Sequence, residues 1–277
     1  MNINKDITTK AIRQEKRTLQ ITSRISTFCL HKLIKGSKAG LFTYTITAIE
    51  KSCRHINTMV SSQELYTNPI TIYIEGNIGS GKTTFLTHFQ KIKDATILEE
   101  PVSLWQNVAG VNLLSYAQLT RLQFHTMSTP SPYKIMERSI FSSRIFLENM
   151  KRTSMIRHME AEILEQWYNW CMENTKIRAD LIVYLRTSPE VVYQRMQARG
   201  RKEENSVSLE YLKQIHELHD DWLVRRTLFS VPAPVMIVDG DKSLEEMVPQ
   251  FEKCKDRILS EKIDDTSNTR IVLNTKA

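Results

Sequence analysis

Residues 71–86 of the 277-residue chain read TIYIEGNIGSGKTTFL, and this stretch decides the fold. Its β-branched beginning, Thr71–Ile74, predicts a buried strand. The strand passes into the spacing G-x-x-x-x-G-K-[ST] and then into an apolar segment that opens a helix. In such an arrangement the N–H groups of the loop turn toward phosphate oxygens, and the positive end of the helix dipole faces them. The stretch therefore predicts a nucleoside triphosphate site; a glycine-rich turn without a ligand is the alternative.

The members of this motif have separate expected roles. Lys82 is expected to reach the β- and γ-phosphates, and the Thr83 hydroxyl is expected to hold Mg²⁺. The predicted nucleotide-binding residues of the loop are Gly76, Asn77, Ile78, Gly79, Ser80, Gly81, Lys82, Thr83 and Thr84.

The net charge of +7 is concentrated near the N-terminus. Residues 1–58 contain eleven Lys or Arg against three acidic residues, a net charge of +8, which leaves −1 for residues 59–277. The basic charge is therefore no evidence of a nucleic-acid-binding face, and no nucleic-acid partner is expected. No run of about 18 apolar residues occurs, so no membrane anchor is expected either.

The composition of residues 1–58, rich in Lys, Arg, Ser and Thr, is typical of a mitochondrial presequence. A disordered basic tail, or leader sequence upstream of a start at Met59, is the alternative, and a cytoplasmic location goes with it. The expected organisation is this leader, a linker over residues 59–69, one α/β domain over residues 70–260 and a polar tail over residues 261–277.

Cysteine and histidine spacing does not indicate a structural metal. The four cysteines are far apart and form no C-x-x-C pair, which indicates a reduced compartment. His216 and His219 are three residues apart on a predicted helix and could ligate a metal. A solvated helix face is the favoured interpretation, because no further Cys or His completes a ligand set.

Short apolar runs alternate with helical patterns along the chain, which predicts an α/β fold with a parallel sheet. The predicted strands are Ile70–Ile74, Ala95–Leu98, Lys134–Met136, Leu181–Leu185 and Val235–Val238. The predicted helices are Ala161–Asn174, 189–204, Leu209–Leu223 and Leu244–Ile258. An apolar stripe in the first of these helices is assigned to the core: Ile163, Leu164, Trp167, Trp170 and Cys171.

Charged residues follow the predicted strands, at the edge of the sheet where ligands bind in α/β folds. Glu100 follows the second strand, where a carboxylate can accept the proton of an attacking hydroxyl, and Trp105 can wall a flat substrate. Glu137 and Arg138 follow the third strand and offer a carboxylate near Mg²⁺ and a guanidinium for phosphoryl charge.

A third group of charges suits a mobile lid. Arg195, Arg199 and Arg201 run off a predicted helix toward Glu203 and Glu204. Arginines on a segment that closes can stabilise transferring phosphate. Alone, each group could be a solvated helix face, but together with the loop they favour a kinase. A switch GTPase is disfavoured because the chain lacks N-K-x-D, and a nucleoside monophosphate kinase is disfavoured by the E-P-V…W and E-R-S pair.

Five segments, taken in order, resemble the deoxyribonucleoside kinase family: TIYIEGNIGSGKTT, EEPVSLW, MERSIFSSR, LIVYLRTSPEVVYQRMQARGRKEE and LEYLKQIHELHDDWL. The resemblance covers roughly residues 70–258. It implies a P-loop kinase fold with a five-stranded parallel sheet, flanking helices and an Arg-rich lid, usually as a homodimer. It also implies transfer of the γ-phosphate of ATP, with Mg²⁺, to the 5′-hydroxyl of a small-molecule deoxynucleoside.

The resemblance also implies roles for individual residues. Glu100 is the expected general base, Glu137 the acid that some readings make the proton acceptor, and Arg138 the contact to the 5′-hydroxyl. Glu204 is expected to bind the sugar 3′-hydroxyl. The other expected roles belong to the lid arginines Arg195, Arg199 and Arg201, the base-facing aromatics Trp105 and Phe146, and the adenine-side loop Asp241, Lys242, Ser243 and Leu244.

Three positions of the resemblance bear on the choice of base. Ala117 and Arg121 are similar to the deoxycytidine kinase pattern, but Ser143 lacks the acid of that pattern. Arg121 without an acidic partner would be a buried charge in a dry pocket. These positions predict a broad or pyrimidine-leaning pocket.

The chain also departs from the family. The stretch 110–114 (GVNLL) runs directly into 115–119 (SYAQL), so several helical turns are missing, including the base-reading glutamine and a tyrosine at the 3′-hydroxyl. Gln118 is not at the equivalent place. The loss should reduce base discrimination. An incorrect gene model and a diverged protein both fit, and an ATP-binding pseudoenzyme or dimerisation partner is the alternative function.

Overall fold

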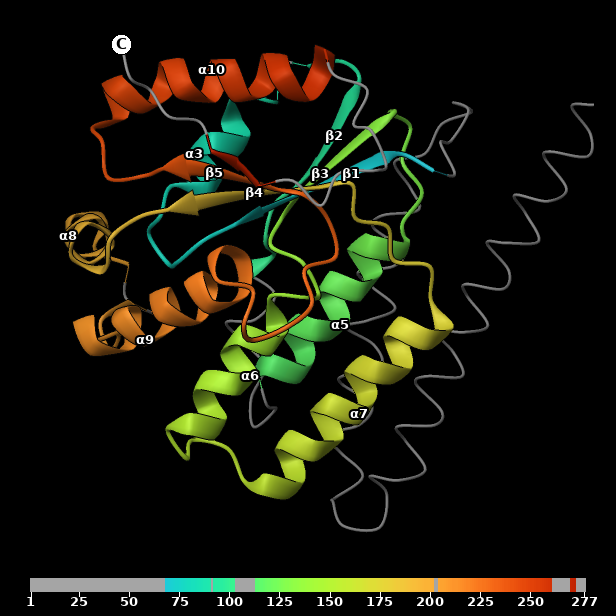
Figure 1. The fold of residues 1–277 in the computed structure, drawn as a ribbon, viewed down its shortest axis with the longest axis vertical. Coiled ribbons are helices and arrows are strands. Elements are labelled where there is room, and N and C mark those ends of the chain that lie inside the picture. The colour runs from blue at the N-terminus through green and yellow to red at the C-terminus, as the bar shows by residue number, and fades with distance from the viewer. Residues whose placement is uncertain (1–67, 91, 103–112, 202–203, 261–269, 273–277) are drawn as a thin grey trace, which may run out of the picture. The chain divides into compact units, whose positions relative to one another are not determined.

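A single parallel sheet forms the centre of the computed structural model, which describes residues 68–90, 92–102, 113–201, 204–260 and 270–272. The strand order is β2-β3-β1-β4-β5-β6 (Figure 1). The strands are β1 Ile70–Glu75, β2 Ala95–Leu98, β3 Tyr133–Glu137, β4 Leu181–Arg186, β5 Val235–Asp239 and β6 Arg270–Val272. The five predicted strands are confirmed, each within one residue at either end.

The strand β6 lies within the expected polar tail over residues 261–277, where the sequence predicts no strand. Arg270–Val272 pair in parallel with β5, with Val235 opposite Arg270 and Ile237 opposite Val272. Two β-branched residues in a row, Ile271 and Val272, suit an extended edge strand. The sheet therefore extends one short strand beyond the predicted five.

The helices include all four with predicted bounds, and each of these four differs in extent from its prediction. They are α3 Lys82–Thr87, α5 Leu113–Thr126, α6 Ser143–Arg152, α7 His158–Asn174, α8 Pro189–Arg199, α9 Leu209–His219, the π-helix η2 Asp220–Val224 and α10 Leu244–Ser260. Helix α8 ends at Arg199 and not at Glu204, because Gly200 adopts a left-handed φ of 65° and its N–H caps the carbonyl of Met196 at 3.1 Å. The predicted helix Leu209–Leu223 is split into α9 and η2.

The helices cover both faces of the sheet. Figure 1 shows α3 and α10 on one face and α5, α6 and α9 on the other. Successive side chains of β1 alternate between the faces: Ile72 and Ile74 pack with Phe85 and Phe251, whereas Tyr73 packs in the second cluster, with Trp222 of η2. Each face of the central strand is thus buried by apolar side chains.

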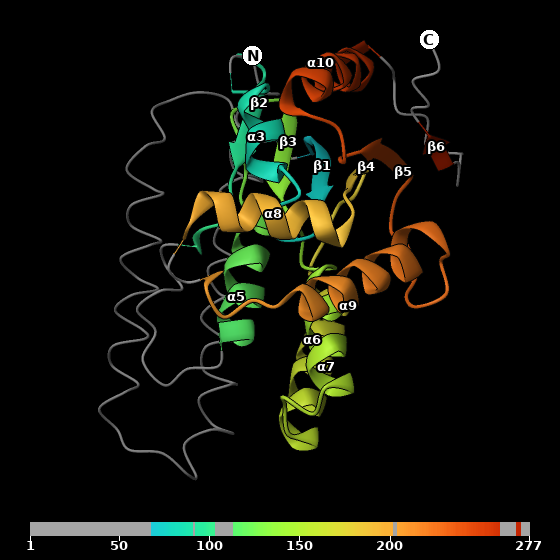
Figure 2. The same ribbon diagram turned by 90° about the vertical axis from the view of Figure 1, so that its left-hand side faces the viewer.

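Helix α8 lies close to the glycine-rich loop. Val192 and Met196 of α8 pack against Leu212 of α9, and Ile78 of the loop joins the same cluster. Figure 2 shows α8 and α9 beside one another, beyond the lower end of β1. The expected lid arginines on α8 are therefore held beside the loop that the sequence assigns to phosphate.

The assignment of the α7 stripe to the core is wrong for two of its members. Leu164 and Cys171 are buried, but Ile163 is 55% exposed and Trp170 is 36% exposed. Helical periodicity identifies an apolar face but not the element that covers it. Within the described residues, none of the helices combines the length and apolarity that a bilayer crossing requires.

Candidate active site

The glycine-rich loop, residues 76–83, is shaped by close backbone approaches. Gly76 has φ +147° and Gly79 has φ +76°. A Cβ atom at Gly76 would lie 2.7 Å from the carbonyl oxygen of Leu185, and one at Gly79 would lie 2.9 Å from that of Val192. The loop therefore passes so close to the end of β4 and to α8 that only glycine fits.

Lys82 lies buried beneath this loop, where its Nζ donates to the carbonyl of Asn77 at 2.7 Å. Burial and the neighbouring Arg138 lower the pKa of Lys82 to about 8, against the opposing effect of nearby carboxylates. Asn77 in turn donates from Nδ2 to the carbonyl of Leu212 at 2.8 Å, which ties the loop to α9. Lys82 is thus held by the loop that the sequence assigns to phosphate.

Thr83 and Glu137 meet at the edge of the sheet. The Thr83 hydroxyl lies 3.2 and 3.3 Å from the two carboxylate oxygens of Glu137. Strand β3 brings Glu137 there, since Glu137 pairs with Ile74 in the parallel register. One hydroxyl and one carboxylate fit Mg²⁺, which is bound in such sites by one or two protein oxygens together with substrate phosphates. No group of three His, Cys, Asp or Glu among the described residues could hold a metal by itself.

Glu100 lies between two arginines. Arg121 donates from NH2 to its Oε1, and Arg138 donates from Nε to its Oε2 at 3.3 Å. Burial raises the pKa of Glu100, but Arg138, Arg121 and Lys82 outweigh it, so the pKa lies below its usual value. The carboxyl group is therefore held ionised, as an acceptor of hydrogen bonds and protons must be.

Arg138 occupies a strained turn directly after β3. Its φ is +62°, in the left-handed region that residues with a Cβ rarely adopt. Its N–H donates to the carbonyl of Ile74 at 3.0 Å, and its guanidinium lies 4.9 Å from the ring centre of Phe146. Strain of this kind persists where the surrounding structure fixes it, commonly at functional sites.

The residues that the resemblance links to base choice are brought together between α5 and α6. Arg121 donates from NH1 to the Ser143 hydroxyl at 2.8 Å, its guanidinium lies 5.8 Å from the Phe146 ring, and Ala117 is buried one helical turn before it. The expected buried-charge problem does not arise, because the carboxylate of Glu100 pairs with Arg121. The resemblance places this acid at position 143, whereas in the fold it is Glu100, just after the end of β2.

The lid residues divide into two groups. Arg195 donates to the carbonyls of Gly240 and Lys242 at 2.8 and 2.7 Å, so it is anchored to the loop after β5. Arg199 pairs with Glu204, and Arg201 lies 3.9 Å from the same carboxylate. Arg199 and Arg201 therefore both face the carboxylate of Glu204.

The expected adenine-side loop continues from Arg195. Asp241 accepts from the N–H of Ser188 at 2.6 Å, which joins this loop to the start of α8. Ser243 caps α10 through Glu246, with a hydroxyl-to-carboxylate distance of 2.8 Å, and Leu244 is 57% exposed. Trp105 lies outside the described residues, together with the rest of residues 103–112. Of the shortened stretch, residues 110–112 fall in this gap, whereas residues 113–119 lie in α5.

Glu75 is a site residue for which the sequence predicts no role. It is fully buried at the end of β1, beside the loop, and accepts from the Ser139 hydroxyl at 2.6 Å. Burial raises its pKa despite the opposing effects of Arg138 and the Ser139 hydrogen bond. Its place directly before the first glycine was the only signal in the sequence.

The expected solvated face of His216 and His219 is wrong. Both are buried, with 8% and 0% of their surface exposed. His219 donates from Nδ1 to the carbonyl of Ile215 at 2.7 Å and stacks on Tyr184, and burial lowers its pKa to about 3. The helix α9 turns this face toward the sheet because Ile215 and Leu218 pack there.

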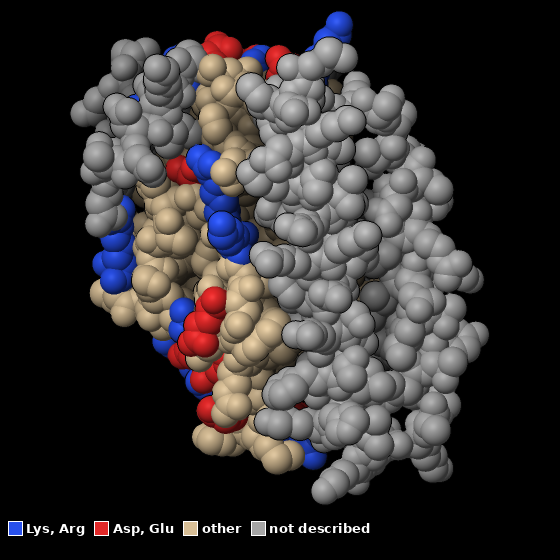
Figure 3. Space-filling model, turned by 90° about the vertical axis from the view of Figure 1, so that its right-hand side faces the viewer, with Lys and Arg blue, Asp and Glu red and all other residues tan. Residues whose placement is uncertain are grey.

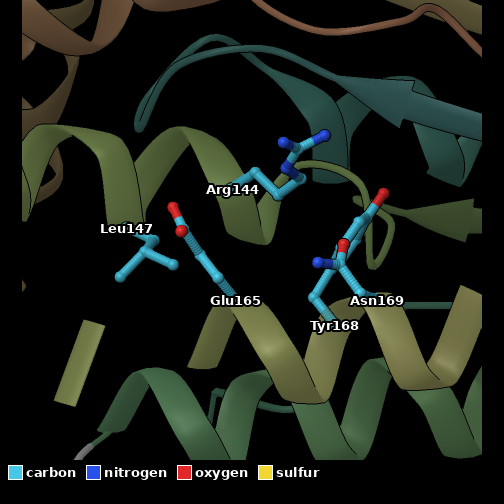
Figure 4. Close-up of a pocket in the computed structure, with 5 residues that line it drawn as sticks. All are labelled: Arg144, Leu147, Glu165, Tyr168 and Asn169. Carbon is cyan, nitrogen blue, oxygen red and sulfur yellow. The ribbon is translucent and has the colours of Figure 1, made fainter. Parts of the chain in front are cut away.

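A small hollow lies away from these residues, between α6 and α7 (Figure 4). It has a volume of about 90 Å³ and is lined by Arg144, Leu147, Glu165, Tyr168 and Asn169. Sites for drug-sized ligands usually measure roughly 300–1,000 Å³, so this hollow does not accommodate a nucleoside.

On the described part of the face in Figure 3, basic and acidic side chains both occur.

A parallel α/β sheet with a glycine-rich loop after its central strand, and with carboxylates and arginines at the same edge, defines a nucleotide-dependent kinase. The model of the deoxynucleoside kinase family matches residues 72–264. The chain belongs to the deoxynucleoside kinase family and is a phosphotransferase that acts on deoxynucleosides with a nucleotide as phosphate donor. The resemblance stated from the five sequence segments is thereby confirmed.

Individual relatives agree with this family. Mitochondrial thymidine kinase 2 of Macaca fascicularis is 44% identical over 205 residues, which cover 68% of this chain and 77% of the relative. Mitochondrial thymidine kinase 2 of Homo sapiens is 43% identical with the same coverage. Deoxycytidine kinase 2 of Gallus gallus is 31% identical over 228 residues, covering 65% of this chain and 86% of the relative.

Proposed function

We propose that this protein transfers the γ-phosphate of ATP to the 5′-hydroxyl of a deoxynucleoside, with Glu100 as the general base. The observation that carries the proposal is the position of the Glu100 carboxylate between Arg121 and Arg138, at the sheet edge where the glycine-rich loop begins. A carboxylate held ionised there can accept the proton of the hydroxyl as it attacks. Arg138, touching the same carboxylate, can stabilise the charge that develops on the transferred group.

The phosphate donor is assigned to the loop. Residues 76–84 would surround the β- and γ-phosphates, with Lys82 as the counter-charge. Thr83 and Glu137 would hold Mg²⁺, which supplies charge neutralisation on the phosphate oxygens. The 3.2 Å approach of the Thr83 hydroxyl to Glu137 supports this pairing. Because Glu100 is the proposed proton acceptor, Glu137 can serve as a metal ligand.

The lid is proposed to exchange partners when substrates bind. Arg199 and Arg201 now face Glu204. In the closed state the two arginines would contact phosphate, and Glu204 would accept from the sugar 3′-hydroxyl. Arg195 would stay anchored to the loop after β5, where Asp241–Leu244 flank the adenine. Exchanging the two ion pairs of Glu204 for contacts with substrate keeps the charges compensated in both states.

The preferred substrates are proposed to be pyrimidine deoxynucleosides. Ala117, Arg121, Ser143 and Phe146 line one side of the proposed base site, and Trp105 is assigned to its wall. Ala117 and Ser143 have small side chains, and the Arg121 guanidinium offers donors to a base carbonyl. The named relatives phosphorylate thymidine or deoxycytidine according to their names. A mitochondrial location is proposed on the composition of residues 1–58 and on the mitochondrial relatives.

A homodimer through α7 is also part of the proposal. Met159, Ile163 and Trp170 are spaced by four and seven residues, so they lie on one face of the helix. Their exposed fractions are 67%, 55% and 36%. Apolar side chains grouped on an exposed face are typical of an interface, and a second copy of the same helix presents a self-complementary surface.

The test is a phosphate-transfer assay with the full chain, Mg²⁺-ATP and each of the four deoxynucleosides. Transfer to thymidine or deoxycytidine above transfer to the purine deoxynucleosides is expected. Equal transfer to all four would contradict the pyrimidine preference alone. No transfer to any of them, with ATP still bound, would favour the pseudoenzyme alternative and attribute the loss to the shortened stretch after Leu114.

A further inference from the structure

The turn that carries Arg138 is clamped by residues that touch neither proposed substrate. On the side of β1, the Ser139 hydroxyl donates to Glu75 Oε1 at 2.6 Å. On the side of α5, the N–H of Ile140 donates to Nε2 of His125 at 2.9 Å. The strained φ of Arg138 is thus followed immediately by two buried hydrogen bonds, from two different elements.

His125 is the middle member of a buried chain of hydrogen bonds. Its Nδ1 lies 3.0 Å from the Tyr73 hydroxyl, and that hydroxyl donates to the carbonyl of Arg178. His125 and Tyr73 have 9% and 0% of their surface exposed, and the two rings meet edge to face with centres 5.1 Å apart. The chain therefore connects the turn after β3 with β1 and with the segment before β4.

The donor and the acceptor of each of these hydrogen bonds are determined. A backbone N–H can only donate, so His125 Nε2 must accept from Ile140 and carry no proton. Nδ1 then bears the ring proton and donates to the Tyr73 oxygen, whose own proton goes to Arg178. Burial, together with Lys134 and Arg121, keeps the pKa of His125 well below its ordinary value, which matches a neutral ring. Only one tautomer of a neutral histidine satisfies all three contacts.

We propose that His125 is a positioning residue that holds the Arg138 turn in the geometry required for phosphoryl transfer. The proposal rests on the catalytic role proposed above for Arg138. His125 lies on α5, the helix that also presents Ala117 and Arg121 to the proposed nucleoside site. Helix α5 therefore fixes the position of the nucleoside-facing residues relative to the turn that bears Arg138. A mutation far from the reacting atoms that displaces an active-site group by about 1 Å can reduce the rate about 100-fold.

The test compares His125→Leu with His125→Gln in the full chain. Leucine keeps the apolar packing against Tyr73 and Phe141 but removes the acceptor for Ile140, whereas the glutamine carbonyl can replace Nε2. We expect His125→Leu to lower kcat about 10- to 100-fold with KM for ATP within about twofold, because His125 touches neither the glycine-rich loop nor the lid. His125→Gln should recover at least about tenfold of that loss. Equal kcat in both variants, or wild-type kcat in His125→Leu, would overturn the proposal.

Two further variants separate this inference from its premise. Arg138→Ala tests the catalytic role itself: if it keeps wild-type turnover, the proposed function of Arg138 fails, whatever His125 does. If Arg138→Ala is inactive and His125→Leu is fully active, only the positioning role fails. Should His125→Leu not fold, Tyr73→Phe decides, since it removes one hydroxyl and no packing. It should lower kcat several-fold at unchanged KM for ATP, and an unchanged kcat would overturn the inference.

Discussion

Arg121 of helix α5 forms a buried ion pair with Glu100, which lies two residues after the end of β2. Only 4% of the Arg121 side chain and 13% of the Glu100 side chain are exposed. A second cation, Arg138, contacts the other oxygen of the carboxylate. Since the two cations hold the pKa of Glu100 low, replacing Arg121 should change both stability and the pH dependence of turnover.

Arg121→Met is expected to destabilise the fold by about 3 kcal/mol, the lower end of the range for broken buried ion pairs, because Arg138 still faces Glu100. The loss of one cation raises the pKa of Glu100. The acid limb of the kcat/KM profile should therefore move to higher pH, so that the variant loses more activity at pH 5.5 (about one unit above the ordinary carboxyl pKa) than at pH 8.

A suitable control for this change is Arg152→Met. Arg152 is exposed and pairs with Glu148 one turn away on α6, and exposed pairs of this kind contribute about 0.3–0.5 kcal/mol. Urea unfolding gives the stability of both variants, and pH–rate profiles give the acid limb. An unshifted acid limb in Arg121→Met would mean that Glu100 does not titrate in catalysis.

Glu100→Gln tests the general base directly. The amide keeps the shape of the carboxyl group, so the fold should survive. Its oxygen can still accept from one of the two arginines, but its NH₂ group cannot accept from the other, and the amide cannot take a proton. We expect kcat to fall about 10²- to 10⁴-fold with the affinity for ATP unchanged. Glu99→Gln is the matched control, because Glu99 is the exposed neighbour in the chain and accepts a hydrogen bond from the Gln90 side chain at 2.9 Å. Turnover of Glu100→Gln close to that of Glu99→Gln would reassign proton transfer, with Glu137 as the next candidate.

The burial of Lys134 predicts that the free energy of unfolding depends on pH through a group outside the proposed catalytic residues. It is 2% exposed on β3 and donates to the carbonyls of His125 and Met127 at 2.8 and 2.9 Å, at the end of α5. Burial lowers its pKa to about 7, whereas the unfolded chain keeps the proton up to roughly pH 10.4. Between these values unfolding takes up a proton, so raising the pH stabilises the folded state.

The stability of the wild type relative to Lys134→Met should therefore increase with pH above 7, by on the order of 1 kcal/mol per pH unit, and should be flat below it. Urea unfolding at several pH values between 6 and 9.5, a window around the folded pKa of about 7, measures this difference. A constant difference across that range would show that Lys134 retains its proton in the folded protein.

Local signals in the sequence were sufficient for the loop and for five of the six strands of the described sheet. The strand β1 and residues 76–83 follow from β-branched runs and glycine spacing within one stretch, and each physical cause is local. The pairing of Arg121 with Glu100 could not be read in the same way, because it depends on how α5 packs beside the end of β2. Position 143 was the natural place to look for the acid, and the fold supplies it elsewhere.

The same limit applies to His125 and to α7. The sequence offers no sign that His125 accepts from Ile140, since the contact requires the exact approach of a helix end to a turn. For α7, periodicity identified the apolar residues but placed Ile163 and Trp170 in the core, whereas they are exposed. An apolar face is only buried if some element covers it, and that element can belong to another copy of the chain.

Ile163→Glu tests this last point. If α7 forms the interface of a homodimer, a charge in the middle of the apolar face would be buried without a partner, which is strongly unfavourable. We expect the variant to sediment as a monomer at concentrations at which the wild type is a dimer. Leu244→Glu is the matched control, because Leu244 on α10 is exposed to a similar extent, 57% against 55% for Ile163. If Ile163→Glu keeps the mass of the wild type in sedimentation, α7 is not the interface; if the wild type is itself a monomer at all concentrations, the dimer is excluded.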